Sequence, residues 1–213
     1  MYPIYRYDIE QNTEEWENIK IGMFSASAAD KLLSSKDTKG YQQLISKIAE
    51  ERITGLKCES SSFMGNSFTN RGHEYESIAR HDYEFRTLQA VKLIGVIIKD
   101  EWTLCSPDGL IDDNKHHQIK CPIFSTQEEY LEKASKYTDI RKIIPSNYYK
   151  QLQFELNVSG REINIFTSYH PNLKAIDIEV PIDVEMQIEI NKRLKEAKEE
   201  VLSRIEKIKR LQI

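Results

Sequence analysis

The sequence predicts an α/β fold in which a mixed central sheet is flanked by helices. Three observations predict it. Apolar residues recur with a helical period over residues 41–53, residues 88–98 are rich in Val, Ile and Leu, and apolar and polar residues alternate over residues 162–169. Helical and extended segments therefore follow one another along the chain, which is typical of a layered α/β domain.

The predicted helices dominate the first part of the chain. We expect helices over residues 10–20, 41–53 and 68–83. A further short helix is expected to end at Leu33 and to be capped by Ser25 or Ser27, because a serine oxygen accepts from the free N–H groups of a first turn. Residues 55–66 are rich in glycine and serine and are expected to form a loop.

Strands and helices alternate in the second part. Extended segments are expected over residues 88–98, 103–111, 117–121, 162–169 and 176–180, with Pro107 and Gly109 interrupting the second of them. Helices are expected over residues 125–137, 146–158 and 184–213. The last is long, charged and amphipathic, so it either contacts another subunit or forms a solvated surface.

The composition predicts a soluble globular protein. Residues 1–213 are expected to form a single domain, with 39% hydrophobic and 30% charged residues. No apolar run is long enough to span a membrane, and the first residues lack the apolar core of a secretory signal. The three cysteines are scattered, which fits a reducing cytoplasm and predicts no zinc site. A net charge of −4 leaves nucleic-acid binding open, since a binding site needs only a local basic strip.

The residues that suggest chemistry surround Asp108, in a turn set by Pro107 and Gly109. Gln118 and Lys120 are two residues apart, so in a strand they project from the same face, and a hairpin would bring them near Asp108. With an acid at position 118, two carboxylates would hold Mg²⁺ or Mn²⁺ and the lysine would stand beside the attacking water and the phosphate. Spacing alone equally allows a hairpin with a Pro–Gly corner and polar surface residues.

Four motifs, in order along residues 13–170, resemble those of the lambda-exonuclease/YqaJ-type viral recombinase family in the PD-(D/E)xK nuclease superfamily. They are WENIKIGMFSAS at residues 16–27, GHEYE at residues 72–76, CSPDGL at residues 105–110 followed by QIKCP at residues 118–122, and YYKQLQ at residues 148–153. The resemblance implies a restriction-endonuclease-like core and a nuclease activity that uses Mg²⁺ or Mn²⁺, with two ions expected.

The resemblance also implies roles for individual residues. Asp108, Gln118 and Lys120 match the catalytic positions. Asp108, position 118, the backbone carbonyl of Ile119 and Glu76 match the metal ligands. The expected DNA contacts are Lys20, Ser27, Ser106 and Gln151, together with Lys36 and Lys39 as anchors for a terminal 5′-phosphate and Arg71 as a further basic residue.

The sequence departs from the family at position 118, where the family has a catalytic glutamate and this chain has Gln118. Glutamine is neutral and cannot take up a proton, so it should weaken the metal site. Two explanations are open. Gln118 is a deliberate substitution that traps uncut DNA, or it is natural and an acid elsewhere acts instead. The otherwise intact motif favours the first, because a decayed site usually loses more than one member.

The function implied by the resemblance is a 5′-to-3′ exonuclease that digests linear double-stranded DNA for phage-type recombination and is inactivated here by Gln118. The alternative is a catalytically silent subunit that binds DNA ends or serves as a scaffold and recruits a single-strand annealing protein. An endonuclease of the same superfamily is a third possibility. The resemblance further implies a homotrimeric ring, an annealing-protein partner, and a cytoplasmic location as a phage or prophage protein in a bacterial cell.

Overall fold

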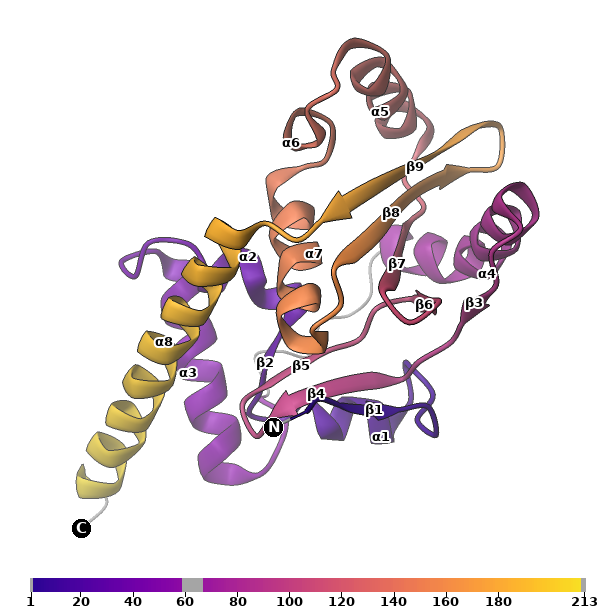
Figure 1. Ribbon diagram of the computed structural model, residues 1–213. Coiled ribbons are helices and arrows are strands. Elements are labelled where there is room, and N and C mark those ends of the chain that lie inside the picture. The colour runs from indigo at the N-terminus through magenta and orange to yellow at the C-terminus, as the bar shows by residue number, and fades with distance from the viewer. Residues whose placement is uncertain (1, 59–66, 212–213) are drawn as a thin grey trace.

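The protein is built from two mixed sheets with helices packed around them (Figure 1). The structure is a computed structural model that describes residues 2–58 and 67–211, with the side chains of residues 67–73 left out. The α/β class is confirmed. The sheet is divided into two, where a single central sheet was expected.

The first sheet has the strand order β1-β4-β5-β2. Its strands are β1 (Ile4–Arg6), β4 (Val96–Asp100), β5 (Thr103–Cys105) and β2 (Phe24–Ser25). β2 runs parallel to β5, and the other neighbours are antiparallel. The first strand was not predicted, because three residues are too few to show a period.

The second sheet has the order β3-β6-β7-β8-β9. It contains β3 (Val91–Lys92), β6 (Gly109–Ile111), β7 (Lys115–Lys120), β8 (Ile163–His170) and β9 (Leu173–Pro181). β3 and β4 lie in different sheets, so the predicted strand over residues 88–98 is in fact two strands separated by a break. Gly95 stands at this break, where a Cβ atom would lie only 2.1 Å from the carbonyl oxygen of Ile9.

β7 and β8 are parallel neighbours, so the chain must cross from one end of the sheet to the other between them. The crossover contains α5 (Phe124–Lys136), α6 (Ile140–Ile143) and α7 (Ser146–Ser159). α7 packs against both sheets. This places one helix beside the ends of strands from each sheet, which is where the candidate site lies.

The remaining helices cover the first sheet and the edge of the second. They are α1 (Glu14–Ile19), a 3₁₀ turn (Ala26–Ala28), α2 (Ala29–Leu32), α3 (Lys39–Thr54), α4 (Ser67–Thr87) and α8 (Val184–Leu211). α4 packs against β7 and β8, and α3 lies along α8. None of the described helices is long and apolar enough to cross a membrane.

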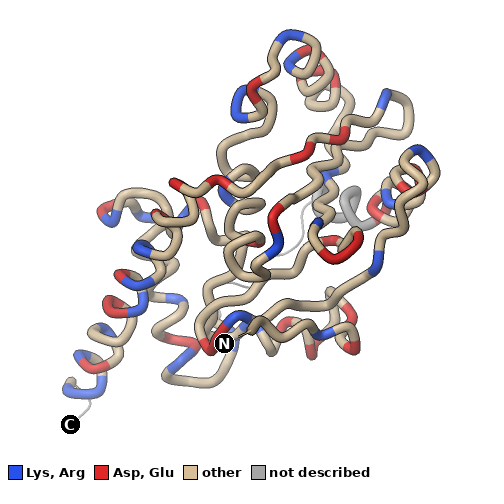
Figure 2. Tube along the Cα trace, viewed as in Figure 1, with Lys and Arg blue, Asp and Glu red and all other residues tan. Residues whose placement is uncertain are grey.

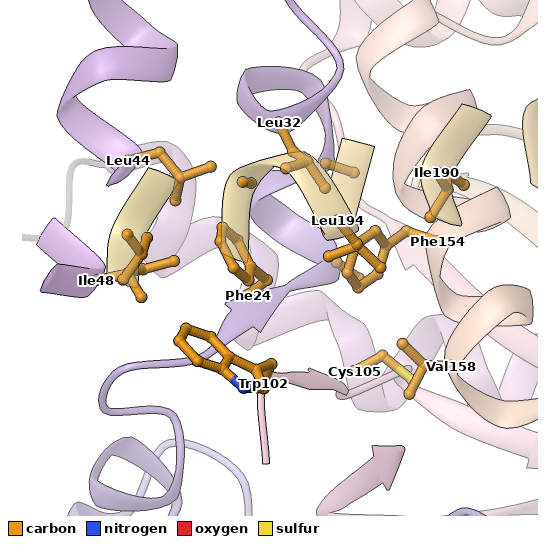
Figure 3. Close-up of a cluster of buried hydrophobic side chains, with 14 of the residues drawn as sticks. Phe24, Leu32, Leu44, Ile48, Trp102, Cys105, Phe154, Val158, Ile190 and Leu194 are labelled. Carbon is orange, nitrogen blue, oxygen red and sulfur yellow. The ribbon is translucent and has the colours of Figure 1, made fainter. Parts of the chain in front are cut away.

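The main hydrophobic core lies where α2, α3, α7 and α8 meet the first sheet (Figure 3). Phe24, Ile48 and Phe154 are almost completely buried there, and Leu194 of α8 reaches the same cluster. Burial of such side chains is worth roughly 1.5–3 kcal/mol each, so this core holds the helices at fixed positions against the strands.

Local signals explain where the helices begin and end. Thr38 caps α3 by accepting from the N–H of Tyr41, and Gly55 ends it with a φ of 68°. Ser25 stands at the start of the turn before α2, but its hydroxyl makes no capping hydrogen bond. Its Oγ instead lies 3.0 Å from the Oγ of Ser27. Residues 59–66 of the expected loop lie outside the described part of the chain.

Candidate active site

A cleft of about 1140 Å³ opens beside α7, and most of the residues singled out from the sequence line it. They are Asp108, Gln118, Ile119, Lys120, Glu76, Gln151, Ser106, Ser27 and Lys20. Lys36 and Lys39 do not line it. The cleft is therefore lined by residues of α1, the turn before α2, α4, the β6–β7 hairpin and α7.

The β6–β7 hairpin brings the two halves of the central motif together, as its spacing predicted. Gly109 pairs with His117, which puts the turn residue Asp108 beside Gln118. Asp108 Oδ2 accepts from Gln118 Nε2 at 2.5 Å and from the backbone N–H of Ile119 at 2.6 Å. Gly109 fits because a Cβ atom there would meet the Val91 side chain at 2.2 Å.

The environment of Asp108 disfavours its negative charge. Burial raises the pKa of Asp108 to about 7; the charge of Glu76 adds to this shift, while Lys120 and the Ile119 N–H oppose it. Burial also raises the pKa of Glu76 on α4, and Arg80 and Lys120 oppose that shift. The pKa values of both carboxyl groups are thus raised by burial, although the charges of Lys120 and Arg80 act against the shift.

Lys120 ends β7 on the side of the cleft occupied by Gln118. Its Nζ lies 5.1 Å from the centroid of the Tyr148 ring, which is a favourable place for a cation. The positive charge of Lys120 also lowers the pKa values of Asp108 and Glu76, against the effect of burial.

Gln151 of α7 connects Gln118 to an acid that the sequence analysis missed. Gln151 Nε2 donates to Gln118 Oε1 at 3.3 Å and to Glu155 Oε1 at 3.0 Å. Asn164 of β8 donates to the second oxygen of Glu155 at 2.6 Å. Burial raises the pKa of Glu155 to about 7 against these two hydrogen bonds. The signal available in the sequence was the spacing, since Glu155 follows Gln151 by four residues on one helix face.

The rim of the cleft near α1 is basic. Lys20 Nζ lies 3.2 Å from the centroid of the Trp16 ring and 2.8 Å from a carboxylate oxygen of Glu17, whose other oxygen binds Lys57 at 2.8 Å. Burial lowers the pKa of Lys20. Trp16 also donates to Ser106 Oγ at 3.0 Å, which ties this rim to the turn that carries Asp108.

Two of the expected phosphate anchors lie elsewhere. Lys36 forms a 2.9 Å ion pair with Glu196 of α8, and Lys39 begins α3. Lys47 and Lys57 line the cleft in their place. The side chain of Arg71 lies outside the described part of the chain. The sequence could not show which of these lysines line the cleft, because that depends on how distant segments of the chain pack together.

The oxygen-rich walls of the cleft fit a hard divalent cation. Buried carboxyl groups, together with main-chain and amide oxygens, are ligands that Mg²⁺ and Mn²⁺ prefer. Among the described residues, no three His, Cys, Asp or Glu side chains form a ready metal-ligand group. The residues present therefore fit such a cation with one carboxylate fewer than expected, because position 118 supplies the amide of Gln118.

Comparison with known proteins identifies the family. Residues 15–162 match the YqaJ-like viral recombinase domain. The chain belongs to this family. None of the curated proteins matches it significantly. The family match covers most of α1, the β6–β7 hairpin and α7, so it includes most of the residues that line the cleft.

Solved structures of exonucleases share the fold. An alkaline exonuclease from Laribacter hongkongensis, LHK-Exo, is 26% identical, with a TM-score of 0.80 over 94% of this chain and 98% of that one. A structure of LHK-Exo in complex with dAMP matches equally well. A phage-related exonuclease from Haemophilus somnus 129PT is 13% identical, with a TM-score of 0.69 over 87% of this chain and 96% of that one, and shows the same fold. The fold is thus of the PD-(D/E)xK type, and the family and LHK-Exo support a nuclease that binds DNA.

Proposed function

We propose that the protein is a 5′-to-3′ exonuclease that digests one strand of linear double-stranded DNA in phage-type recombination. The observation that carries the proposal is the meeting of Asp108, Gln118 and Lys120 in one cleft, in a chain of the YqaJ-like viral recombinase family. The likeness to an alkaline exonuclease supports exonuclease activity. The dAMP complex of that enzyme supports a site for a deoxynucleoside monophosphate.

The proposed cofactor is Mg²⁺ or Mn²⁺, with two ions, held by Asp108, Glu76 and the Ile119 carbonyl and only weakly by Gln118. When bound, the ions polarise the phosphate and stabilise the charge that develops on it. The protein's own part is to orient the DNA backbone. Lys120 offers a positive charge to the phosphate oxygens, and Ser106 and Ser27 offer hydroxyl groups to its neighbours.

Gln118 lowers the activity in this proposal. A neutral amide replaces a carboxylate, and its Nε2 donates to Asp108 instead of leaving that carboxylate open to a cation. If this costs about 4 kcal/mol in the transition state, the reaction is roughly 10³-fold slower. The same hydrogen bond favours the second candidate function, a silent subunit that binds DNA ends and recruits a single-strand annealing protein.

The first prediction is that Gln118→Glu raises Mg²⁺-dependent digestion of linear duplex by about 10³-fold. The substrates carry a label on each strand and either a 5′-phosphate or a 5′-hydroxyl end. We expect mononucleotides from the 5′-phosphorylated strand, faster than from the hydroxyl end, and no cutting of closed circles. Gln118→Glu combined with Asp108→Asn is the matched control and should be inactive.

Three results would contradict parts of this proposal. Digestion from 3′ ends sets aside the direction, and cutting of closed circles favours an endonuclease. A folded Gln118→Glu protein that binds DNA ends but digests nothing favours the silent subunit.

The proposed assembly is a homotrimeric ring around DNA, and the proposed anchors for the terminal phosphate are Lys20, Lys47 and Lys57 on the basic rim. The rim replaces Lys36 and Lys39 in this role because Lys20, Lys47 and Lys57 line the cleft, whereas Lys36 and Lys39 do not. Light scattering of the purified protein measures the assembly directly, and a monomer in the presence of DNA would set the ring aside.

A further inference from the structure

Glu155 is a buried carboxyl group in the wall of the cleft to which the proposed reaction gives no role. It lies on α7, its side chain has no exposed surface, and it is one of the residues that line the cleft. An ionised carboxylate in such a place is costly unless an opposite charge stands beside it. Its position therefore calls for a positive partner.

The hydrogen-bond partners of Glu155 are neutral. Gln151 and Asn164 each donate an amide N–H to one of its oxygens, and no Lys, Arg or His of the described residues forms an ion pair with it. Amide donors satisfy the oxygens but do not neutralise the charge. The other amide atom of Asn164, Oδ1, is buried and accepts no hydrogen bond from any described residue. The buried polar cluster of Glu155, Gln151 and Asn164 therefore contains a carboxylate with no cation paired to it and an amide oxygen with no donor among the described residues.

Glu155 also stands next to the position where the family's carboxylate is missing. A single amide nitrogen, Gln151 Nε2, lies 3.0 Å from Glu155 Oε1 and 3.3 Å from Gln118 Oε1. On its other side Gln118 contacts Asp108. A chain of hydrogen bonds through the amides of Gln118 and Gln151 thus connects the carboxyl groups of Asp108 and Glu155.

We propose that Glu155 supplies the carboxylate ligand that Gln118 cannot, so that a divalent cation is held between Asp108 and Glu155. This inference rests on the proposed function, in that the cleft binds such a cation. The negative charge that is missing at position 118 is then supplied by Glu155, on α7 of the same chain. A cation bound between Asp108 and Glu155 displaces the hydrogen bond from Gln118 to Asp108, so the site binds metal even though Gln118 slows the reaction.

The test measures Mn²⁺ binding without DNA, by calorimetry and by loss of the electron-paramagnetic-resonance signal of free Mn²⁺. Glu155→Gln should weaken binding at least tenfold. The double variant Gln118→Glu/Glu155→Gln moves the acid back to position 118 and should bind within about threefold of the unchanged protein. Glu51→Gln is the matched control, since Glu51 is 2% exposed and outside the cleft lining, and it should leave binding unchanged.

Thermal melts show which variants fold, and if Glu155→Gln does not, Glu155→Asp takes its place and should also weaken Mn²⁺ binding. A folded Glu155→Gln protein that binds Mn²⁺ as well as the unchanged one overturns the inference. So does a folded double variant that stays as weak as the single one, or an unchanged protein that binds no Mn²⁺ at millimolar concentration. Because DNA digestion is not the readout, the exonuclease proposal can fail while metal binding still depends on Glu155, or the reverse.

Discussion

At the scale of single residues, the central question is why one position departs from an otherwise matching motif. Asp108 and Gln118 lie together as the hairpin spacing predicted, and their contact follows from the β6–β7 pairing. Glu155 could not be recognised in the same way, because the sequence of a helix does not show whether an acidic residue faces solvent or a cleft. Only the packing of α7 against both sheets reveals that it is buried.

The role of Lys120 gives a prediction at this scale. In the Gln118→Glu protein, Lys120→Gln should slow digestion by about 10²–10³-fold, because it removes a positive charge aimed at the phosphate. Mn²⁺ binding should persist, since the lysine is not a ligand. Single-turnover digestion at saturating DNA measures the rate. Lys207→Gln on α8 is the control, and an equal loss there would mean that net charge alone matters.

At the scale of elements, strong periodicity was a reliable guide and short elements were not. Leu44, Ile45 and Ile48 predicted α3, which begins two residues before the expected range because Thr38 caps it. The short elements β1 and α6 went unrecognised, since neither spans enough residues to repeat. The split between β3 and β4 was also missed, although Gly95 marks it, because a glycine within an apolar run does not say whether the strand bends or ends.

Asp183 is the residue on which the start of α8 depends most. Its Oδ1 accepts from the N–H of Met186 at 3.2 Å, and its Oδ2 accepts from Tyr149 at 2.9 Å and from Arg141 at 2.6 Å. Burial opposes ionisation, but these three partners hold the pKa of Asp183 below its usual value of 3.8. One carboxylate therefore joins α8 to α6 and α7.

Asp183→Ala should lower the free energy of unfolding by about 1–2 kcal/mol at pH 7, the usual cost of losing a helix cap. A lowered pKa favours the folded state above pH 3.8, so the difference from the unchanged protein should be constant from pH 8 to pH 5 and shrink as the pH falls below 3.8. Urea unfolding at each pH measures it. Glu185→Ala, at an exposed position of the same turn, should change stability by less than about 0.5 kcal/mol, and an equal effect there would contradict the capping role.

At the scale of the whole molecule, the formal charge of −4 conceals an uneven distribution. Both signs alternate along α8, where ion pairs such as Lys36–Glu196 join it to the rest of the protein (Figure 2). The basic rim of the cleft gathers Lys20, Lys47 and Lys57 in one place. DNA binding should therefore depend on where a lysine stands and not on the total charge.

Salt dependence tests this distribution. Lys20→Ala should weaken binding of duplex DNA of any sequence and make the plot of log affinity against log salt shallower by about 0.9, the value for one lost phosphate contact. Lys207 and Lys209 lie on the last turns of α8 and are not among the residues that line the cleft, so changing both to Ala should alter neither quantity. Fluorescence anisotropy from 50 to 300 mM salt gives both numbers. A reversed pattern would place the DNA along α8.

The parallel pairing of β7 with β8 has a consequence for how the protein folds. The β6–β7 hairpin is local in sequence, so Asp108 and Lys120 can meet as soon as that hairpin forms. Gln151 and Glu155 join them only after the chain of residues 121–162 has closed a long loop and β8 has found β7. Non-local pairing of this kind is slow to form. During synthesis, Asp108 and Lys120 are therefore brought together early, and Gln151 and Glu155 of α7 join them later. We expect the ability to cleave DNA to appear at the end of folding and not gradually.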